Sequence, residues 1–167
     1  MALSKQSVAL LLAVLAAAAA SPASADGGLP CGHVRKITVQ NLSGRDLWLT
    51  AVSLANSPHL FAPFLLHHGT HAEFLVCSWT GRLHAVDAPT PEFHLGHDGG
   101  AWYMAPTDQA AGPVRVAVAP HTDPAHGALQ GHCPAVGCAA HGQCFQHDVP
   151  GGNCANVDEI KIIYYSA

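Results

Sequence analysis

The chain has 167 residues, with seven Lys and Arg against eleven Asp and Glu and a formal net charge of −4. An acidic chain without a basic stripe argues against nucleic acid as a partner. Beyond the N-terminal leader, no stretch approaches the roughly 18 apolar residues that a membrane span needs.

Residues 1–25 have the features of a secretory signal peptide. Lys5 precedes the apolar run VALLLAVLAAAAA, and Ala23-Ser24-Ala25 is a small-x-small cleavage site. We therefore expect a secreted, extracellular protein. Its mature part, residues 26–167, is expected to form a single domain with enough chain to bury a core.

Short strands, and hardly any helix, are predicted along the mature chain. Prolines and glycines are frequent, and β-branched or alternating runs recur between turn residues without a sustained 3.6-residue period. The first two runs flank Ser43-Gly44 and read as a hairpin. The predicted strands are 34–41, 46–54, 72–79, 81–86, 92–95, 101–105, 113–120 and 159–165. This spacing predicts an all-β sandwich or barrel.

All six cysteines follow the leader, and they are Cys31, Cys77, Cys133, Cys138, Cys144 and Cys154. An even number on an oxidising secretory route favours disulfides over metal ligands. Residues 121–154 are loop-like and hold four of the six, and such a segment gains most from covalent closure. Asn41-Leu42-Ser43 is a sequon that predicts glycosylation of Asn41 if this side chain is exposed.

Several segments, taken in order, carry a family resemblance. In ITVQNLSGRDLWLTAV, a strand ending at Asn41 is followed by a strand containing Trp48. LVCSWTGRLHAVDAPTPEFHL holds a cysteine, then Gly81-Arg82, a threonine and a Glu-Phe-x-Leu strand. CPAVGCAAHGQCFQHDVPGGNC combines Cys-x4-Cys-Ala-Ala, Gly-Gln-Cys and Pro-Gly-Gly-x-Cys. Together these segments resemble the thaumatin-like proteins, the pathogenesis-related defence proteins of plants.

The resemblance implies a divergent, small member of that family. It implies an all-β thaumatin-like sandwich with a short disulfide-closed C-terminal loop region, and with the second lobe largely missing because most of the family's cysteines are absent. It also implies a Cys144–Cys154 bridge. The other four cysteines allow three pairings, and the simplest reassignment joins Cys31 to Cys77 and Cys133 to Cys138.

The resemblance also implies a ligand site. Many thaumatin-like proteins have an acidic cleft of an arginine, a glutamate and several aspartates, linked to β-1,3-glucan binding and in some members to weak hydrolysis. Arg82 and Glu92 match the arginine and the glutamate, and Asp98 lies just upstream of a missing aspartate. The places of the other aspartates fall at about Ala101, Met104 and Arg115.

Binding is favoured over catalysis. Glycoside hydrolysis needs a pair of carboxyl groups, and only Glu92 is well supported by the resemblance. Motifs for a serine nucleophile or a phosphate loop are absent from the sequence. The resemblance then implies a monomeric, antifungal or stress-related protein of the plant apoplast, without a cofactor, whose partner is a β-glucan or a fungal cell-wall surface.

Histidine is unusually frequent, with 13 in the chain. His67, His68 and His71 form an HHxxH group, while His132, His141 and His147 lie among the C-terminal cysteines. Converging imidazoles bind Zn²⁺ or Cu²⁺, so the alternative is a His-rich extracellular protein that binds metal or a small ligand on the same scaffold. The simpler interpretation is solvated loop histidines that supply pH-dependent charge.

Overall fold

The computed structural model describes residues 31–54, 56–96, 100–109, 112–140, 143–145 and 153–167. The predicted signal peptide, residues 1–25, lies outside these ranges. In the described part, none of the helices is long and apolar enough to cross a membrane.

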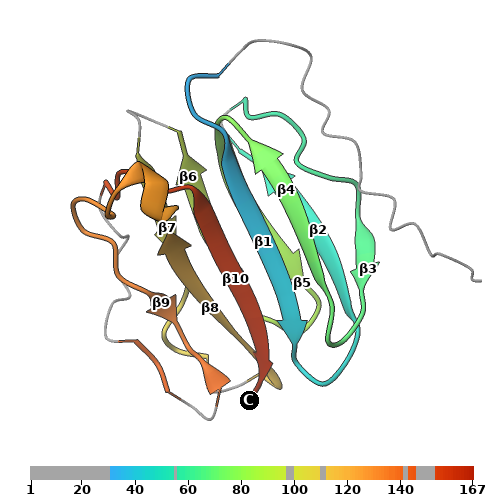
Figure 1. Ribbon diagram of the computed structural model, residues 1–167. Helices are drawn as coiled ribbons and strands as arrows, with labels where there is room; N and C mark the ends of the chain where they lie inside the picture. The colour runs from blue at the N-terminus through green and yellow to red at the C-terminus, as the bar shows by residue number, and fades with distance from the viewer. Residues whose placement is uncertain (1–30, 55, 97–99, 110–111, 141–142, 146–152) are drawn as a thin grey trace, which may run out of the picture.

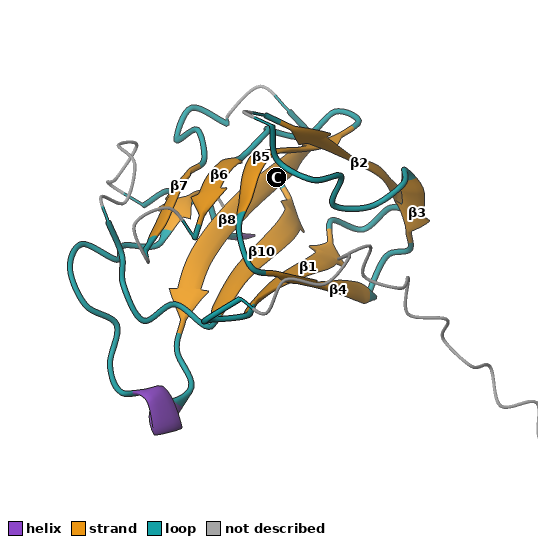
Figure 2. Cartoon of the chain, turned by 90° about the horizontal axis from the view of Figure 1, so that it is seen from above, coloured by secondary structure: helices purple, strands orange, loops and turns teal. Residues whose placement is uncertain are grey.

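Two five-stranded sheets face each other (Figures 1 and 2). We call them sheet A, with strand order β4-β1-β10-β8-β9, and sheet B, with strand order β3-β2-β5-β6-β7. The strands of sheet A are β4 (His71–Val76), β1 (Arg35–Leu42), β10 (Glu159–Ser166), β8 (Val114–His121) and β9 (Val136–Gly137). Those of sheet B are β3 (Phe64–Leu66), β2 (Leu47–Ser53), β5 (Trp79–Ala85), β6 (Glu92–Leu95) and β7 (Ala101–Met104). A short 3₁₀ helix, Pro124–His126, follows β8.

The first and last strands pair in parallel at the centre of sheet A, as Figure 1 shows for β1 and β10. All other strand pairs are antiparallel. Along each strand, alternate side chains point between the sheets, because successive residues of a strand face opposite sides. In β1, for example, Ile37 and Val39 are fully buried whereas Lys36 and Gln40 are partly exposed.

The core lies between the two sheets. Its largest fully buried side chains come from both of them: Trp79, Phe93, Tyr103, Leu47, Leu49, Leu83 and Leu95 from sheet B, and Tyr164, Ile37, Ile160 and Ile162 from sheet A. The predicted all-β sandwich is therefore confirmed, and all eight predicted strands are present within a few residues of their expected bounds. The sequence missed the two shortest strands, β3 and β9, which have three and two residues and are too short to show an alternating pattern.

Three disulfides link the six cysteines: Cys31–Cys77, Cys133–Cys154 and Cys138–Cys144. The predicted Cys31–Cys77 bridge is confirmed, and it ties the segment before β1 to the bend between β4 and β5. The predicted Cys144–Cys154 and Cys133–Cys138 bridges are wrong.

Backbone pairing explains the correction. Cys138 faces Cys144 across an antiparallel bridge, and the amide N–H of Ala139 donates to the carbonyl of Gln143 at 2.8 Å. Cys154 instead pairs with Ala101 of β7 and so lies against the edge of sheet B. The two ends of GQCFQHDVPGGNC therefore belong to different parts of the fold, and each cysteine bonds to the partner that its own backbone pairing brings near.

Asn41 is a structural residue, and the exposure on which its predicted glycosylation depends is not found in the folded protein. The residue is fully buried at the end of β1. Its Nδ2 donates to the carbonyl of Arg45 at 2.8 Å and to that of Leu66 at 2.9 Å. Its Oδ1 accepts from the amide and the hydroxyl of Ser43. A glycan on Nδ2 would displace bonds that hold the β1–β2 turn against β3.

Candidate functional site

Arg82 and Glu92 lie side by side on the outer face of sheet B. They are partners in the β5–β6 register, and Arg82 Nε donates to Glu92 Oε2 at 2.6 Å. The arginine side chain is 53% exposed and the carboxylate 17%. The structure therefore joins the two residues that the sequence predicted together, with the cation toward solvent and the carboxylate held beneath it.

His94 and Trp102 extend this pair. His94 lies two residues after Glu92 on the same face of β6, and its Nε2 is 2.9 Å from Glu92 Oε1. Trp102 is the register partner of His94 on β7, and the two rings meet edge to face with their centroids 4.5 Å apart. Each oxygen of Glu92 thus has one partner, and the cluster ends on an aromatic ring. We refer to Arg82, Glu92, His94 and Trp102 as the sheet B cluster.

Buried neighbours fix the strands that carry this cluster. The alternate residues Leu83, Phe93 and Tyr103 are fully buried beneath it. Gly81 permits a close approach on the inner side, because a Cβ at this position would lie 2.3 Å from the Trp79 ring and 2.6 Å from the carbonyl oxygen of Val52. The local structure therefore explains the Gly81-Arg82 sequence. The glycine leaves space for the Trp79 ring on the inner face, and Arg82 points to the outer face.

The pKa of Glu92 is lowered from its ordinary value. The hydrogen bond from His94 contributes most, followed by the one from Arg82, and together they outweigh the opposing effect of partial burial. Glu92 is thus an anionic acceptor over the physiological pH range. A general acid for glycoside cleavage needs the reverse, a carboxyl group whose pKa is raised.

The second carboxylate of a hydrolytic pair is not found near Glu92 among the described residues. Its register partner on β7 is Met104. Ala101 is buried against Cys154, and Arg115 lies on β8 in the other sheet. Asp98, predicted as a third ligand-binding residue, lies outside the described residues.

The HHxxH group has structural partners. His67 Nδ1 is 2.9 Å from Asp46 Oδ2, and the amide of His68 donates to Asp46 Oδ1 at 2.9 Å. The His68 bond is the largest cause of a lowered Asp46 pKa, and the His67 contact adds to it. His68 Nδ1 also accepts from the amide of Gly44. These histidines therefore fasten the β3–β4 turn to the β1–β2 turn.

Metal-binding geometry is not found among the described side chains, where no group of three or more His, Cys, Asp or Glu residues is arranged to hold a metal ion. Of the C-terminal histidines that the sequence analysis grouped, His141 and His147 lie outside the described ranges.

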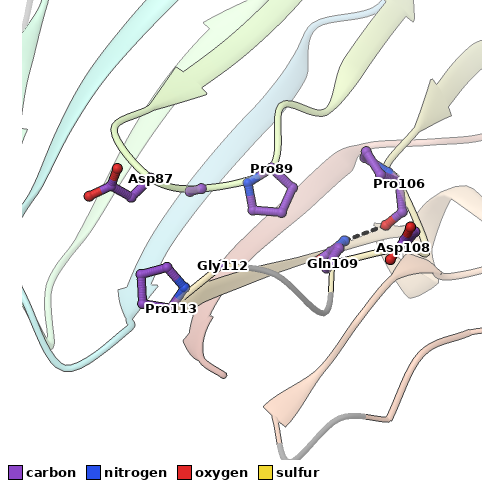
Figure 3. Close-up of a pocket in the computed structure, with 8 residues that line it drawn as sticks. Asp87, Pro89, Pro106, Asp108, Gln109, Gly112 and Pro113 are labelled. Carbon is purple, nitrogen blue, oxygen red and sulfur yellow. Dashed lines mark hydrogen bonds between the residues drawn. The ribbon is translucent and has the colours of Figure 1, made fainter.

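A hollow of about 450 Å³ lies elsewhere, beside the turn after β5 (Figure 3). Its one buried polar side chain is Gln109, whose amide bonds the backbone of Pro106 and Val116. Asp87 on its rim points away from the other lining residues and pairs with Arg45 at 3.3 Å. Two of the polar groups that line the hollow, Gln109 and Asp87, are thus bound to protein partners.

Sequence reasoning missed His94 and Trp102 as members of the site. The period of two that places Glu92 on the outer face of β6 also places His94 there. The position of Trp102 beside His94 follows only from the β6–β7 register, and residues 97–99 that connect these strands lie outside the described part. The signal for His94 was thus present in the sequence, while the signal for Trp102 was not.

Comparison with known proteins gives likenesses of fold alone. No family model and no curated protein matches the chain. The solved structure of the protein elicitor MoHrip2 from Magnaporthe oryzae overlaps with a TM-score of 0.48 at 11% identity, covering 79% of this chain and 98% of that one. The thaumatin-like xylanase inhibitor TLXI overlaps with a TM-score of 0.44 at 10% identity, covering 77% and 97%. At these TM-scores and identities the overlaps carry no further conclusion about this chain.

Proposed function

We propose that the protein is a secreted plant defence or stress protein that binds a β-glucan of a cell wall or fungal surface through the outer face of sheet B. The observation that carries this proposal is the sheet B cluster, in which Arg82, Glu92 and His94 are already joined beside the Trp102 ring. A sugar presents hydroxyl groups to such donors and acceptors and a C–H face to an aromatic ring.

The proposed activity is binding of the glucan without its hydrolysis. The described residues supply one carboxylate at the cluster, and its lowered pKa keeps it charged. Hydrolysis needs two carboxyl groups with different protonation states. Among the described residues, Arg82 bonds Glu92 through its Nε, which leaves its terminal nitrogens for ligand hydroxyls.

Secretion is supported by the cysteines. All six are in disulfides and none is free, which fits an extracellular protein because disulfides persist on the oxidising side of the secretory route. The apoplast, the predicted leader over 1–25 and a single monomeric domain over 26–167 are parts of the same proposal.

Retention on insoluble β-1,3-glucan tests the proposal. The wild-type protein should be pulled down, and Glu92→Gln should lose most of this retention because Arg82 and His94 lose their charged acceptor. The matched control is Glu73→Gln, the same chemical change on the outer face of sheet A. Equal loss in both variants, or no retention of the wild type, would refute the proposal, and stoichiometric metal surviving dialysis would favour the metal-binding alternative.

A further inference from the structure

Exposed apolar side chains gather on the outer face of sheet B. The described residues include seven large hydrophobic residues that are exposed: Val34, Leu42, Trp48, Val52, Leu65, Leu75 and Val86. Trp48 and Val52 lie on β2 and Leu65 on β3 of sheet B, and Val86 directly follows β5. A soluble domain seldom leaves such side chains grouped on one face without a use for them.

Three of these side chains form a row at one end of the face. Leu65 on β3 is the register partner of Trp48 on β2. Val86 comes directly after Ala85, the register partner of Leu49. Their exposed fractions are 43%, 50% and 54% in the order Leu65, Trp48, Val86. We call these three residues the Trp48 row.

Trp48 is held outward by its neighbours in the chain. Leu47 and Leu49 are almost fully buried in the core, and a residue between two inward side chains of a strand must point to the opposite face. The ring therefore stays at the surface without a ligand to keep it there, which reduces the entropy cost of using it as a contact surface.

A continuous path joins the Trp48 row to the sheet B cluster. Thr50 faces His84 in the β2–β5 register, and Val52 faces Arg82 two residues further along. Arg82 then faces Glu92, and His94 faces Trp102. With strands about 4.8 Å apart and about 3.3 Å per residue, the two tryptophans lie roughly 25 Å apart along a diagonal of the sheet.

We propose that the Trp48 row is a second sugar-stacking subsite, so that the face binds a linear neutral polysaccharide chain running from Trp48 to Trp102. This inference rests on the proposed function and specifies its ligand. The two tryptophan rings lie at the ends of the path, and Thr50, His84, Arg82 and the exposed Val52 lie between them. A protein partner instead favours an apolar centre with a polar rim. A repeating sugar chain matches the alternation of ring and hydrogen-bonding groups.

Chain length is the variable that tests this subsite. Calorimetric titration with β-1,3-linked oligosaccharides, from disaccharide to octasaccharide, should show weak binding of the short members. A further rise in affinity of at least about tenfold should follow once a member spans both tryptophans. Trp48→Ala should remove this rise and leave the affinity of the short members unchanged. Trp48→Tyr should retain part of it, because an aromatic face remains.

Leu75→Ala is the matched control, since Leu75 is 55% exposed on sheet A, and it should bind every length as the wild type does. Short members that bind with no gain for longer ones would overturn the second subsite while leaving the proposed function standing. Absence of binding at every length would overturn both. A wild-type dimer that Trp48→Ala converts to a monomer in sedimentation would instead assign the row to contact between copies of the chain and overturn the subsite.

Discussion

The outer faces of the two sheets differ although the same alternation produces them. On sheet A, Lys36 lies between Glu73 and Glu159, at 3.1 and 3.3 Å, so charges on neighbouring strands satisfy one another. On sheet B, exposed aromatic and apolar side chains surround one charged pair, Arg82 and Glu92. Both faces pair charges across neighbouring strands, but sheet B also presents the exposed ring of Trp48, and an aromatic ring beside hydrogen-bonding groups can bind a ligand.

The largest effect on stability should come from the contact between β1 of sheet A and β3 of sheet B at Asn41. Asn41 is the last residue but one of β1 in sheet A, and its Nδ2 donates to the carbonyl of Leu66 in β3 of sheet B. Asn41→Ala removes four hydrogen bonds of a fully buried amide. The Leu66 carbonyl and the Ser43 amide lose this partner, while the Arg45 carbonyl still accepts from the Ser43 hydroxyl. We expect the free energy of unfolding in urea to fall by roughly 3 kcal/mol, and both outer faces to be lost together.

Gln40→Ala provides the control for that variant. Gln40 is the neighbouring residue on β1, and its side chain points to the outer face. A change of less than about 0.5 kcal/mol is expected at such a position. If the free energy of unfolding falls by a similar amount in both variants, the stability at this contact does not depend on the Asn41 amide.

Each sheet buries one tyrosine on its inner face, and the two hydroxyl groups differ in their hydrogen bonding. Tyr103 of sheet B donates its hydroxyl to the carbonyl of Pro134 at 2.7 Å. Tyr164 of sheet A is fully buried, and its hydroxyl has no partner among the described residues. Burial raises the pKa of both phenols, so both stay neutral in the folded protein.

Substitution by phenylalanine should therefore have opposite effects on stability. Tyr103→Phe should lower the free energy of unfolding by about 1 kcal/mol because a hydrogen bond is lost. Tyr164→Phe should raise it by up to about 1 kcal/mol, since an unpaired buried hydroxyl is costly. Thermal and urea unfolding of the two variants measure this, and destabilisation by Tyr164→Phe would mean that its hydroxyl is satisfied in solution.

Lowering the pH should affect folding stability through Asp158, a residue that lies outside the proposed binding site. The pKa of Asp158 beside sheet A is lowered: desolvation alone would raise it, but hydrogen bonds from the Asp123 amide, Thr122 and His126 outweigh that effect. A folded pKa below the unfolded one gives stability that is present above the unfolded value, near pH 4, and is lost as pH falls through the folded value. Asp158→Asn should thus be less stable than the wild type at neutral pH and lose less stability on acidification.

Glu92, whose pKa is also lowered, provides the comparison for Asp158. Unfolding free energies and glucan retention are measured for both variants from about pH 7 to about pH 3. Asp158→Asn should change the pH slope of stability and leave retention at neutral pH intact, while Glu92→Gln should abolish retention. If Asp158→Asn also abolishes retention, binding is not confined to sheet B.

The sequence predicted what depends on alternation along one strand. The inward positions of Ile37 and Val39 and the outward positions of Arg82 and Glu92 follow from a period of two. The family resemblance assigned Arg82 and Glu92 to one ligand site, and the β5–β6 register places the two residues side by side.

Features that depend on two distant segments could not be predicted. The bridges from Cys138 to Cys144 and from Cys133 to Cys154 depend on which backbones pair locally. The burial of Asn41 depends on β3, a three-residue strand without a sequence signature. The Trp48 row likewise needs the β2–β3 register before Leu65 can be placed beside Trp48. The disulfide pairing, the burial of Asn41 and the Trp48 row all depend on which residues are neighbours across strands, and a single stretch of sequence does not show this.

The smallest effect should come from the charges of sheet A. Lys36→Ala removes the cation shared by Glu73 and Glu159, but the lysine and Glu73 side chains are 36% and 48% exposed, and solvent screens such pairs. The free energy of unfolding should change by less than about 0.5 kcal/mol, with glucan retention unchanged. Because Glu92→Gln also alters one charged residue on an outer face, a loss of retention in Lys36→Ala as large as in Glu92→Gln would mean that overall charge, rather than the side chains of sheet B, determines binding.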